Sequence, residues 1–279
     1  MTIRILNYFH RKGFYTTLNL LSQAIYFLKG FGYVKSTYQK QFRAYEYKVR
    51  GVTFLSMGPG WAYNLEYLKE LLISTYCHQY LPQSGDCVVD IGSGLGEEVV
   101  VYASLVGKGG SVHALEANPS TYGGLKYMCK QNKFAWVKAH HTAIYNSDGV
   151  VTIEDDAENY LTNTINVSQA SKPGFKVEAK TLDTLVKEND ITRIDFLKSN
   201  IEGAEQYLIE GMQNSINLIK NVCISCHDFR HIYHNHGEFY MTKKKVKIFF
   251  EANGFEVVVR NTGNRVVDDY IYATNKSIK

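Results

Sequence analysis

The residue types best suited to ligand binding or catalysis occur together in one short run, VVDIGSGLGEE at residues 88–98. An apolar, β-branched stretch ends in Asp90, glycines then alternate at positions 92, 94 and 96, and two glutamates follow. This order is typical of a buried strand, a tight turn and a helix N-terminus, where an open α/β sheet binds its ligand. The sequence therefore predicts a ligand site at this turn, and the charges around the turn indicate which ligand it holds.

A dinucleotide is the first candidate for the glycine turn. Its fingerprint requires a third glycine at the position that Glu97 occupies. A diphosphate also favours backbone amide donors without a nearby anion, whereas Asp90, Glu97 and Glu98 place three carboxylates around the turn. This pattern argues against NAD or FAD as the ligand. A nucleotide-dependent oxidoreductase is therefore the third hypothesis, after the two that are described below.

S-adenosylmethionine suits the same turn better, because it has no phosphate and its overall charge is positive. Asp90 could accept a hydrogen bond from its ammonium group. Gly92, Gly94 and Gly96 would let the backbone approach the methionine moiety. The next expected strand ends in Glu116, where an acid can accept hydrogen bonds from both ribose hydroxyls. These residues together predict S-adenosylmethionine as the cofactor.

Regular alternation of strand and helix patterns surrounds this run. Strands are expected at 87–91, 111–115, 136–140, 194–198, 221–226, 255–260 and 270–273, and helices at 64–80, 97–106, 119–131, 182–188, 204–212 and 243–253. Such alternation predicts a parallel sheet covered by helices on both faces, with right-handed crossovers and an antiparallel C-terminal edge. The Ser-Asp-Gly sequence inside residues 145–156 predicts a hairpin turn, and a His-rich polar loop is expected after residue 226.

The first 50 residues differ in charge from the remainder. They contain nine Lys or Arg and one acid, Glu46, whereas the remaining residues contain 22 basic and 26 acidic side chains. Apolar residues recur at helical spacing between Leu18 and Leu28, which predicts one or two helices. We expect this extension to act as a lid, a brace or a homo-oligomer contact, or as a basic helix at a membrane surface. Basic and stacking residues do not alternate as in a nucleic-acid groove, so no nucleic-acid partner is expected.

The five cysteines form no disulfide-scaffold pattern. Cys223 and Cys226 make a CxxC, but both lie in an expected strand, where residues three apart point to opposite faces. They are interpreted as core cysteines in a reducing compartment. No secretory signal is recognised, and the longest apolar stretch is too short to span a bilayer. A cytoplasmic location is expected.

The motif order resembles the FkbM family of S-adenosylmethionine-dependent methyltransferases over about residues 50–275. The resemblance is carried by VVDIGSGLGEE, by HALEANPS, by AIYNSDG and by the run at residues 180–205. The family usually shows Lys-x-Asp-x-Glu-Gly-x-Glu in this run, and Asn200 here replaces the aspartate. The resemblance implies a Rossmann-like class I methyltransferase fold over residues 51–279, with a mostly parallel seven-stranded sheet. It also implies methyl transfer to a hydroxyl oxygen of a sugar, glycan or other natural product.

The resemblance and the charge pattern together define the expected site. The residues expected to bind the cofactor are Asp90, Gly92, Ser93, Gly94, Gly96, Glu97, Glu116, Ala117, Asn118 and Ala143. His227 is the candidate general base, because an unshifted imidazole titrates near neutral pH; the alternative is a hydrogen-bonded structural histidine. Glu202 is a second candidate base or a ligand for substrate hydroxyls; the alternative is an acid that stabilises a helix N-terminus.

The position of Asn200, beside Glu202, bears on metal binding and on activity. Asparagine keeps an oxygen ligand but lacks the charge of the family aspartate, and the histidines after residue 226 match no zinc spacing. No metal is therefore expected. The same substitution supports an alternative function, in which a catalytically degenerate methyltransferase fold serves as a binding or assembly module.

Overall fold

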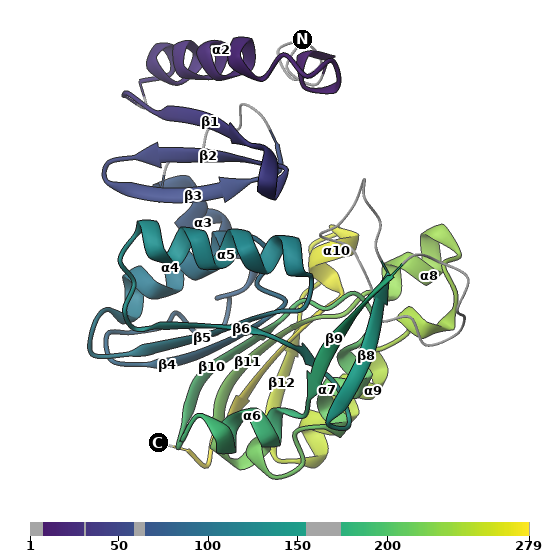
Figure 1. The fold of residues 1–279 in the computed structure, drawn as a ribbon. Coiled ribbons are helices and arrows are strands. Elements are labelled where there is room, and N and C mark those ends of the chain that lie inside the picture. Colours follow the sequence, from purple (N-terminus) through teal and green to yellow (C-terminus); the bar gives the residue numbers. More distant parts are fainter. Residues whose placement is uncertain (1–7, 31, 59–64, 155–173, 279) are drawn as a thin grey trace.

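The computed structural model describes residues 8–30, 32–58, 65–154 and 174–278. Its centre is a seven-stranded sheet with helices on both faces. A smaller N-terminal sheet and a helix are stacked on one of these helical layers, as Figure 1 shows. The N-terminal helix therefore lies in the layer farthest from the large sheet.

The large sheet has the strand order β12-β13-β11-β10-β4-β5-β6. Its strands are β4 (Cys87–Ile91), β5 (Ser111–Glu116), β6 (Val137–His141), β10 (Ile194–Ser199), β11 (Ile219–Ser225), β12 (Phe255–Val259) and β13 (Tyr270–Asn275). All neighbours pair in parallel except β13, which is antiparallel to both β11 and β12. The predicted α/β Rossmann-like fold is confirmed, and the antiparallel strand lies one position inside the C-terminal edge.

Two layers of helices bury the two faces of this sheet (Figure 1). One layer holds α3 (Leu65–Thr75), α4 (Glu97–Val106) and α5 (Pro119–Gln131), and the other holds α6 (Leu182–Glu188), α7 (Glu205–Glu210) and α9 (Lys243–Ala252). Cys223 is buried with the first layer and Cys226 with the second, as predicted for residues three apart along a strand. Within the described residues, no helix combines the length and the apolarity needed to cross a membrane.

Local sequence signals explain where the helices next to the glycine turn begin. α5 begins after Asn118, whose side chain accepts hydrogen bonds from the backbone amides of Ser120 and Thr121, and Pro119 fits the first turn. α4 begins after Gly96, which has a left-handed conformation. A side chain at Gly96 would collide with Met128 and Leu125 of α5. Glycine at this position therefore allows α4 and α5 to pack closely.

The N-terminal layer corrects the prediction of a purely helical extension over residues 1–50. It contains α2 (Tyr15–Leu28) followed by β1 (Lys35–Gln39), η1 (Lys40–Phe42), β2 (Ala44–Val49) and β3 (Val52–Ser56). β1, β2 and β3 form an antiparallel sheet between α2 and the α4–α5 layer. Arg50 and Gly51 both have positive φ and form the two-residue turn from β2 to β3. The expected boundary between residues 50 and 51 thus falls inside a hairpin.

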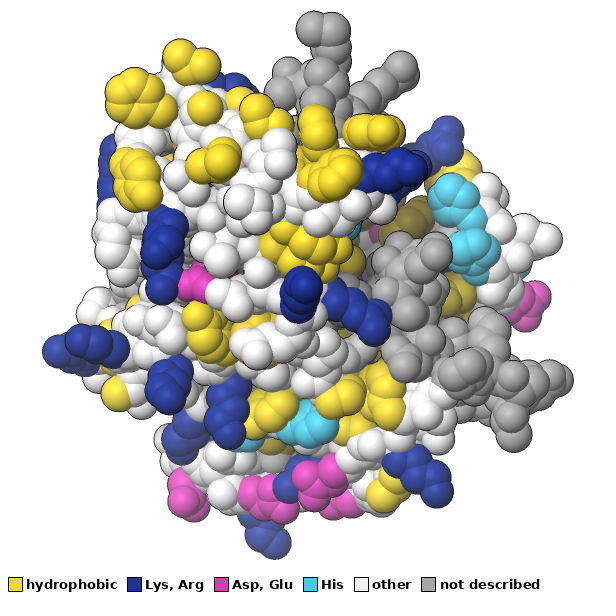
Figure 2. All heavy atoms as spheres, turned by 45° about the horizontal axis from the view of Figure 1, so that its top comes forward, with side chains coloured by type: hydrophobic (Ala, Val, Ile, Leu, Met, Phe, Trp, Pro, Cys, Tyr) yellow, Lys and Arg dark blue, Asp and Glu magenta, His cyan; other side chains and the backbone are white. Residues whose placement is uncertain are grey.

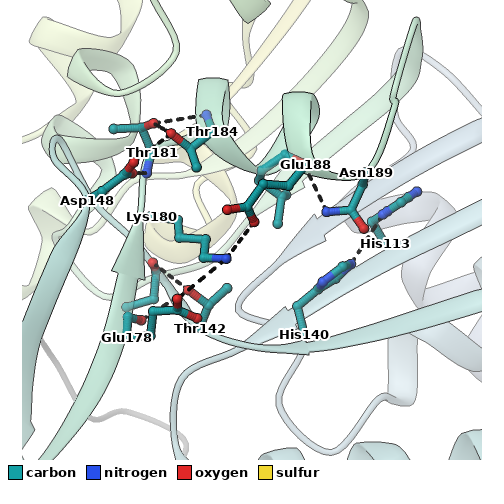
Figure 3. Close-up of polar contacts among 12 residues, drawn as sticks. His113, His140, Thr142, Asp148, Glu178, Lys180, Thr181, Thr184, Glu188 and Asn189 are labelled. Carbon is teal, nitrogen blue, oxygen red and sulfur yellow. Dashed lines mark hydrogen bonds and ion pairs between the residues drawn. The ribbon is translucent and has the colours of Figure 1, made fainter.

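The expected hairpin within residues 145–156 is also wrong. β7 (Ala143–Ile144) and β8 (Gly149–Glu154) do not pair with each other, because β9 (Gly174–Lys180) lies between them. The carboxylate of Asp148 instead accepts hydrogen bonds from the Thr181 amide (2.8 Å) and the Thr184 hydroxyl (2.7 Å), as Figure 3 shows. The Ser-Asp-Gly turn therefore fixes the start of α6.

The short elements near the C-terminal half complete the described chain. They are η3 (Ser215–Leu218), α8 (Asp228–His234), η4 (Glu238–Tyr240) and α10 (Arg265–Asp268). The His-rich segment expected to be a loop therefore forms α8 in its first half. The backbone amides of Thr242 and Lys243 at the start of α9 donate to Asp228, each at 2.9 Å, so Asp228 ties α8 to α9.

Candidate active site

A cavity of ≈ 170 Å³ lies at the carboxyl ends of β4, β5 and β10. This is the edge of an open α/β sheet where ligands bind. The lining includes the glycine turn after β4, the end of β5, parts of β7 and β8, and the segment that follows β10. Of the residues predicted to contact the cofactor, Gly92, Ser93, Gly94, Glu97, Glu116, Ala117, Asn118 and Ala143 line this cavity.

The glycines of the turn have different roles. Gly92 has a positive φ, and a side chain there would collide with the backbone carbonyl of Asn200, so glycine lets the turn lie against the segment after β10. The amides of Gly92 and Ser93 both donate to the Leu115 carbonyl at 3.0 Å, which holds the turn to the end of β5. Gly96 is absent from the cavity lining and packs on α5 instead. The structure therefore places Gly96 outside the cavity wall at which its contact with the cofactor is expected.

Glu116 is held rigidly at the cavity wall. One carboxylate oxygen accepts from the Gly94 amide at 2.7 Å and the other from the Asn118 amide at 2.8 Å. Burial raises the pKa of Glu116, although these amide donors act in the opposite direction. The Thr121 side chain also hydrogen-bonds to this carboxylate, whose remaining acceptor capacity can serve hydroxyls of a bound ligand.

The structure corrects the role expected for Asp90. Its side chain is fully buried, forms an ion pair of 2.9 Å with the ammonium group of Lys198 and does not line the cavity. The partner of Asp90 is thus a lysine on the neighbouring strand rather than a ligand amine. Lys198 also donates to the Gly92 carbonyl at 3.2 Å and reaches the cavity wall. Sequence reasoning used Lys198 only as a motif residue and missed its place in the site.

Lys198 remains charged although it is buried. Burial alone would lower its pKa, but the charges of Asp90 and Glu98 raise it above its usual value. Burial in turn raises the pKa of Glu98, which Lys198 partly offsets. We refer to Asp90, Glu98 and Lys198 as the turn cluster, because they lie beneath and beside the glycine turn.

The charges around the cavity fit a cation. Among the described residues that line it, four are glutamates (Glu97, Glu98, Glu116 and Glu202) and Lys198 is the single Lys or Arg. Such a lining is poor for a diphosphate and favourable for a sulfonium and an ammonium group. Asn200 adds a polar contact, because its side-chain oxygen is buried and has no hydrogen-bond partner within the described parts of the chain. The residues present therefore fit S-adenosylmethionine.

A second group of charged residues follows β10 and β11. Glu202 lines the cavity and forms ion pairs with Arg230 (2.6 Å) and with Nε2 of His227 (3.4 Å). Nδ1 of His227 lies 2.8 Å from Glu205, which also accepts from the Thr242 hydroxyl at 2.9 Å. We refer to Glu202, Glu205, His227 and Arg230 as the imidazolium cluster.

The imidazolium cluster overturns the role of His227 as general base. Burial would lower the pKa of His227, but Glu205 and Glu202 on either side raise it to about 10. The imidazole is therefore protonated at neutral pH, both its nitrogens face carboxylates, and it is absent from the cavity lining. His227 cannot accept a proton from a substrate in this state, so its role is to position Glu202 and Glu205.

Glu202 is the acid of this cluster that reaches the cavity. Burial would raise its pKa, but His227 and Arg230 hold the pKa of Glu202 below its usual value. Its φ of 56° is unusual for a residue other than glycine, and Gly203 follows with a φ of 96°. Glu202 precedes α7, which begins at Glu205, so it is not one of the helical residues of α7.

The described residues contain no group of three or more His, Cys, Asp or Glu arranged to hold a metal ion. Two of the side chains after β11, Asp228 and Tyr233, make contacts within the protein. Asp228 accepts from backbone amides, and the ring of Tyr233 lies 3.9 Å from the guanidinium of Arg265.

Comparison with known sequences identifies the family. The model described as the methyltransferase FkbM domain matches residues 86–257, which is more than half of the chain. The chain belongs to the FkbM methyltransferase family. Members of this family use S-adenosylmethionine, which would supply an activated methyl group on a sulfonium when bound. No curated protein matches the sequence.

Solved structures similar to this FkbM chain include distant methyltransferases. An FkbM methyltransferase from Methylobacillus flagellatus is 15% identical, with 70% of this chain and 45% of that chain covered and a TM-score of 0.46. Aeropyrum pernix fibrillarin with bound S-adenosylmethionine is 14% identical, with 86% and 99% covered and a TM-score of 0.43. A Bacillus cereus O-methyltransferase with S-adenosylhomocysteine is 12% identical, with 76% and 80% covered and a TM-score of 0.46. The chain spans less than half the length of the M. flagellatus protein.

Proposed function

We propose that this FkbM methyltransferase methylates a hydroxyl oxygen of a small molecule or glycan. The observation that carries the proposal is the carboxylate of Glu202 at the cavity wall, fixed by Arg230 at 2.6 Å and by His227 at 3.4 Å. A hydroxyl is a weak nucleophile at neutral pH and needs an acceptor for its proton. A carboxylate that stays ionised and fixed in orientation meets this need.

Different residues of the chain would bind the methyl donor and the methyl acceptor. The backbone of the glycine turn, Glu116 and Asn200 would hold the cofactor, while Glu202 accepts the hydrogen bond of the substrate hydroxyl. As the hydroxyl oxygen gains the methyl group, its proton passes to Glu202 and from there to solvent. Alignment of the reacting atoms supplies most of the acceleration in such a displacement. Arg230 and His227 contribute by preventing Glu202 from rotating away.

The first experiment measures cofactor binding by calorimetry. We expect S-adenosylmethionine to bind and Glu116→Gln to weaken binding by about tenfold or more, because an amide cannot accept from two hydroxyls as a carboxylate does. The matched control is Glu256→Gln, an exposed acid on β12 whose partner is Lys276. Absence of binding by the unaltered protein would contradict the assignment of the cavity to the cofactor.

The second experiment identifies the acceptor atom. The protein is incubated with S-adenosylmethionine carrying an isotope-labelled methyl group and with pools of glycans and hydroxylated small molecules. We expect a labelled product whose methyl resonance is that of an ether and whose methyl group survives mild alkali. A labelled N-methyl product, or a methyl ester cleaved by alkali, would refute hydroxyl methylation while leaving cofactor binding intact.

One observation supports a second candidate, a fold that binds the cofactor without transferring its methyl group. Asn200 stands where the family usually has aspartate, so the cavity has one acid fewer than the family pattern implies. In that case calorimetry would show cofactor binding, and no acceptor pool would become labelled. Restoration of turnover by Asn200→Asp would then identify this residue as the cause.

We further propose that the reaction takes place in the cytoplasm. The five cysteines are all free thiols, and four of them are buried. Free thiols persist in a reducing compartment. Measurement of enzyme activity in fractions of the source cell would test this location.

A further inference from the structure

The outer face of α2 has no partner within the described residues and is strongly apolar. α2 buries Leu18, Ser22 and Tyr26 against the small sheet. Its opposite face exposes Leu20 (63%), Phe27 (72%) and Leu28 (83%), and Phe14 and Tyr33 beside the helix are exposed as well. Figure 2 shows hydrophobic side chains gathered over this end of the molecule. Apolar surface gathered in this way marks an interaction site.

The charges around this face have one sign. α2 itself contains no charged residue, and exposed Arg11, Lys12, Lys29 and Lys35 flank it in the sequence. The single carboxylate in the described residues between positions 8 and 56 is Glu46, which is buried and pairs with Lys48 at 2.8 Å. The outer face of α2 is thus apolar, is bordered by cations and has no exposed acids beside it. Such a face is complementary to a surface whose interior is apolar and whose exterior is anionic.

We propose that α2 docks the protein on an anionic lipid bilayer, with the helix lying in the plane of the membrane interface. Leu20, Phe27 and Leu28 would enter the boundary between headgroups and acyl chains, while Lys12 and Lys29 would face anionic headgroups. A second copy of the chain is the competing partner. A two-fold contact through α2 would bring the same basic residues of both copies together, which costs electrostatic energy. The bilayer is favoured because it supplies the opposite charge.

The test is co-sedimentation of the full chain with vesicles. One vesicle preparation contains phosphatidylcholine alone and the other contains phosphatidylcholine with phosphatidylserine. We expect binding to the anionic vesicles at low salt, with weaker binding when the salt rises to about 0.5 M and screens the cations. Failure of the unaltered protein to sediment with the anionic vesicles would overturn the proposal.

Paired variants separate the apolar contribution from the charge contribution. We expect Phe27→Ser/Leu28→Ser to weaken vesicle binding at least about tenfold. The control Ile248→Ser removes an exposed apolar side chain from α9, away from α2, and should have no effect. Lys12→Glu/Lys29→Glu should lower binding to anionic vesicles several-fold, whereas Lys244→Glu/Lys247→Glu on α9 should lower it less. Equal loss in variant and control would overturn the assignment to α2.

Two further measurements test whether unfolding of the variants or dimerisation through α2 explains the results instead. Thermal unfolding and cofactor binding should be unchanged in the α2 variants, because these side chains are exposed and lie outside the cavity lining. Sedimentation velocity should show a monomer in the absence of vesicles. A dimer that dissociates in Phe27→Ser/Leu28→Ser would replace the bilayer by a second copy as the partner of α2.

Discussion

Two groups of buried charged residues lie next to the cavity, and they differ in the ratio of acids to cations. In the turn cluster, Lys198 is shared between Asp90 and Glu98, so two acids face one cation. In the imidazolium cluster, two acids face two cations, His227 and Arg230. The first cluster keeps a negative balance when its acids are ionised, which suits a cationic cofactor beside it. The second is neutral and fixes the orientation of one carboxylate at the cavity.

This difference indicates that the buried charges of the turn cluster favour binding of a cationic cofactor, whereas those of the imidazolium cluster position a carboxylate. A buried charge without a partner costs several kcal/mol, so each cluster should fail in its own way when one member is removed. Loss of a cation from the turn cluster leaves acids without compensation. Loss of His227 or Arg230 from the imidazolium cluster leaves the buried charges closer to neutral than loss of Lys198 does, but the carboxylate of Glu202 is then no longer fixed in orientation. The four predictions below test this division.

The largest effect is expected for Lys198→Met. Asp90 then remains fully buried without its ion-pair partner, so the free energy of unfolding should fall by about 3–5 kcal/mol. Urea unfolding measures the change. The control Lys247→Met removes an exposed lysine of α9 that pairs with Glu251, and it should change stability by less than about 0.5 kcal/mol. The double variant Asp90→Asn/Lys198→Met should recover part of the loss. A single variant as stable as the control would show that the turn cluster does not depend on its cation.

The second prediction concerns the pH dependence of stability from His227. The pKa of His227 is about 10 in the folded protein and 6.5 in its ordinary state, so the protonated form is favoured by folding. This contribution is fully present below pH about 6.5 and is lost as the pH rises through about 10. We expect His227→Gln to lower stability by roughly 2–4 kcal/mol near pH 6 and by much less near pH 10.

Unfolding of both proteins in urea across this pH range measures the difference. Other groups titrate in both proteins, so the informative quantity is the gap between the two curves rather than either curve alone. A gap that stays constant with pH would show that folding does not raise the pKa of His227, so that its imidazole is largely neutral above pH about 7. That result would remove the imidazolium from the cluster and return His227 to the position of a candidate base.

The sequence predicts the frame of the site better than the contacts within it. β4, α4, α5 and α6 have the predicted bounds because their signals are local: an apolar run, alternating glycines, and capping residues such as Asn118 and Thr181. β1 and β2 were missed because apolar and aromatic residues throughout the first 50 positions also suit a helix. β9 was missed between β7 and β8 because its pairing joins segments that are far apart in the chain.

The errors in the site have a shared physical origin. The partner of Asp90 depends on the register of β10 against β4, which places Lys198 opposite Asp90. The state of His227 depends on Glu205 and Glu202, which reach it from the segment after β10. Residue type alone indicates which groups can ionise, whereas the strand order and the packing decide which charges lie next to each other.

The third prediction concerns Glu202→Gln. If Glu202 accepts the proton of the substrate hydroxyl, kcat should fall by about a hundredfold, within the usual range for loss of a general base. Cofactor affinity should stay within about twofold, because the turn cluster and Glu116 are unchanged. Glu256→Gln is the control for an exposed acid. A variant that keeps full turnover would limit Glu202 to a structural partner of Arg230.

The smallest effect is expected for Glu98→Gln, which removes one charge from the turn cluster without changing its shape. Affinity for S-adenosylmethionine should fall by about threefold to tenfold, whereas affinity for S-adenosylhomocysteine, which lacks the sulfonium charge, should change little. Because burial raises the pKa of Glu98, binding by the unaltered protein should weaken as the pH falls towards that raised value. The variant should lack this part of the pH dependence. Calorimetry with both ligands at several pH values measures the effect. Equal losses for the two ligands would mean that Glu98 acts through packing, and that the negative balance of the turn cluster does not serve recognition of the methyl donor.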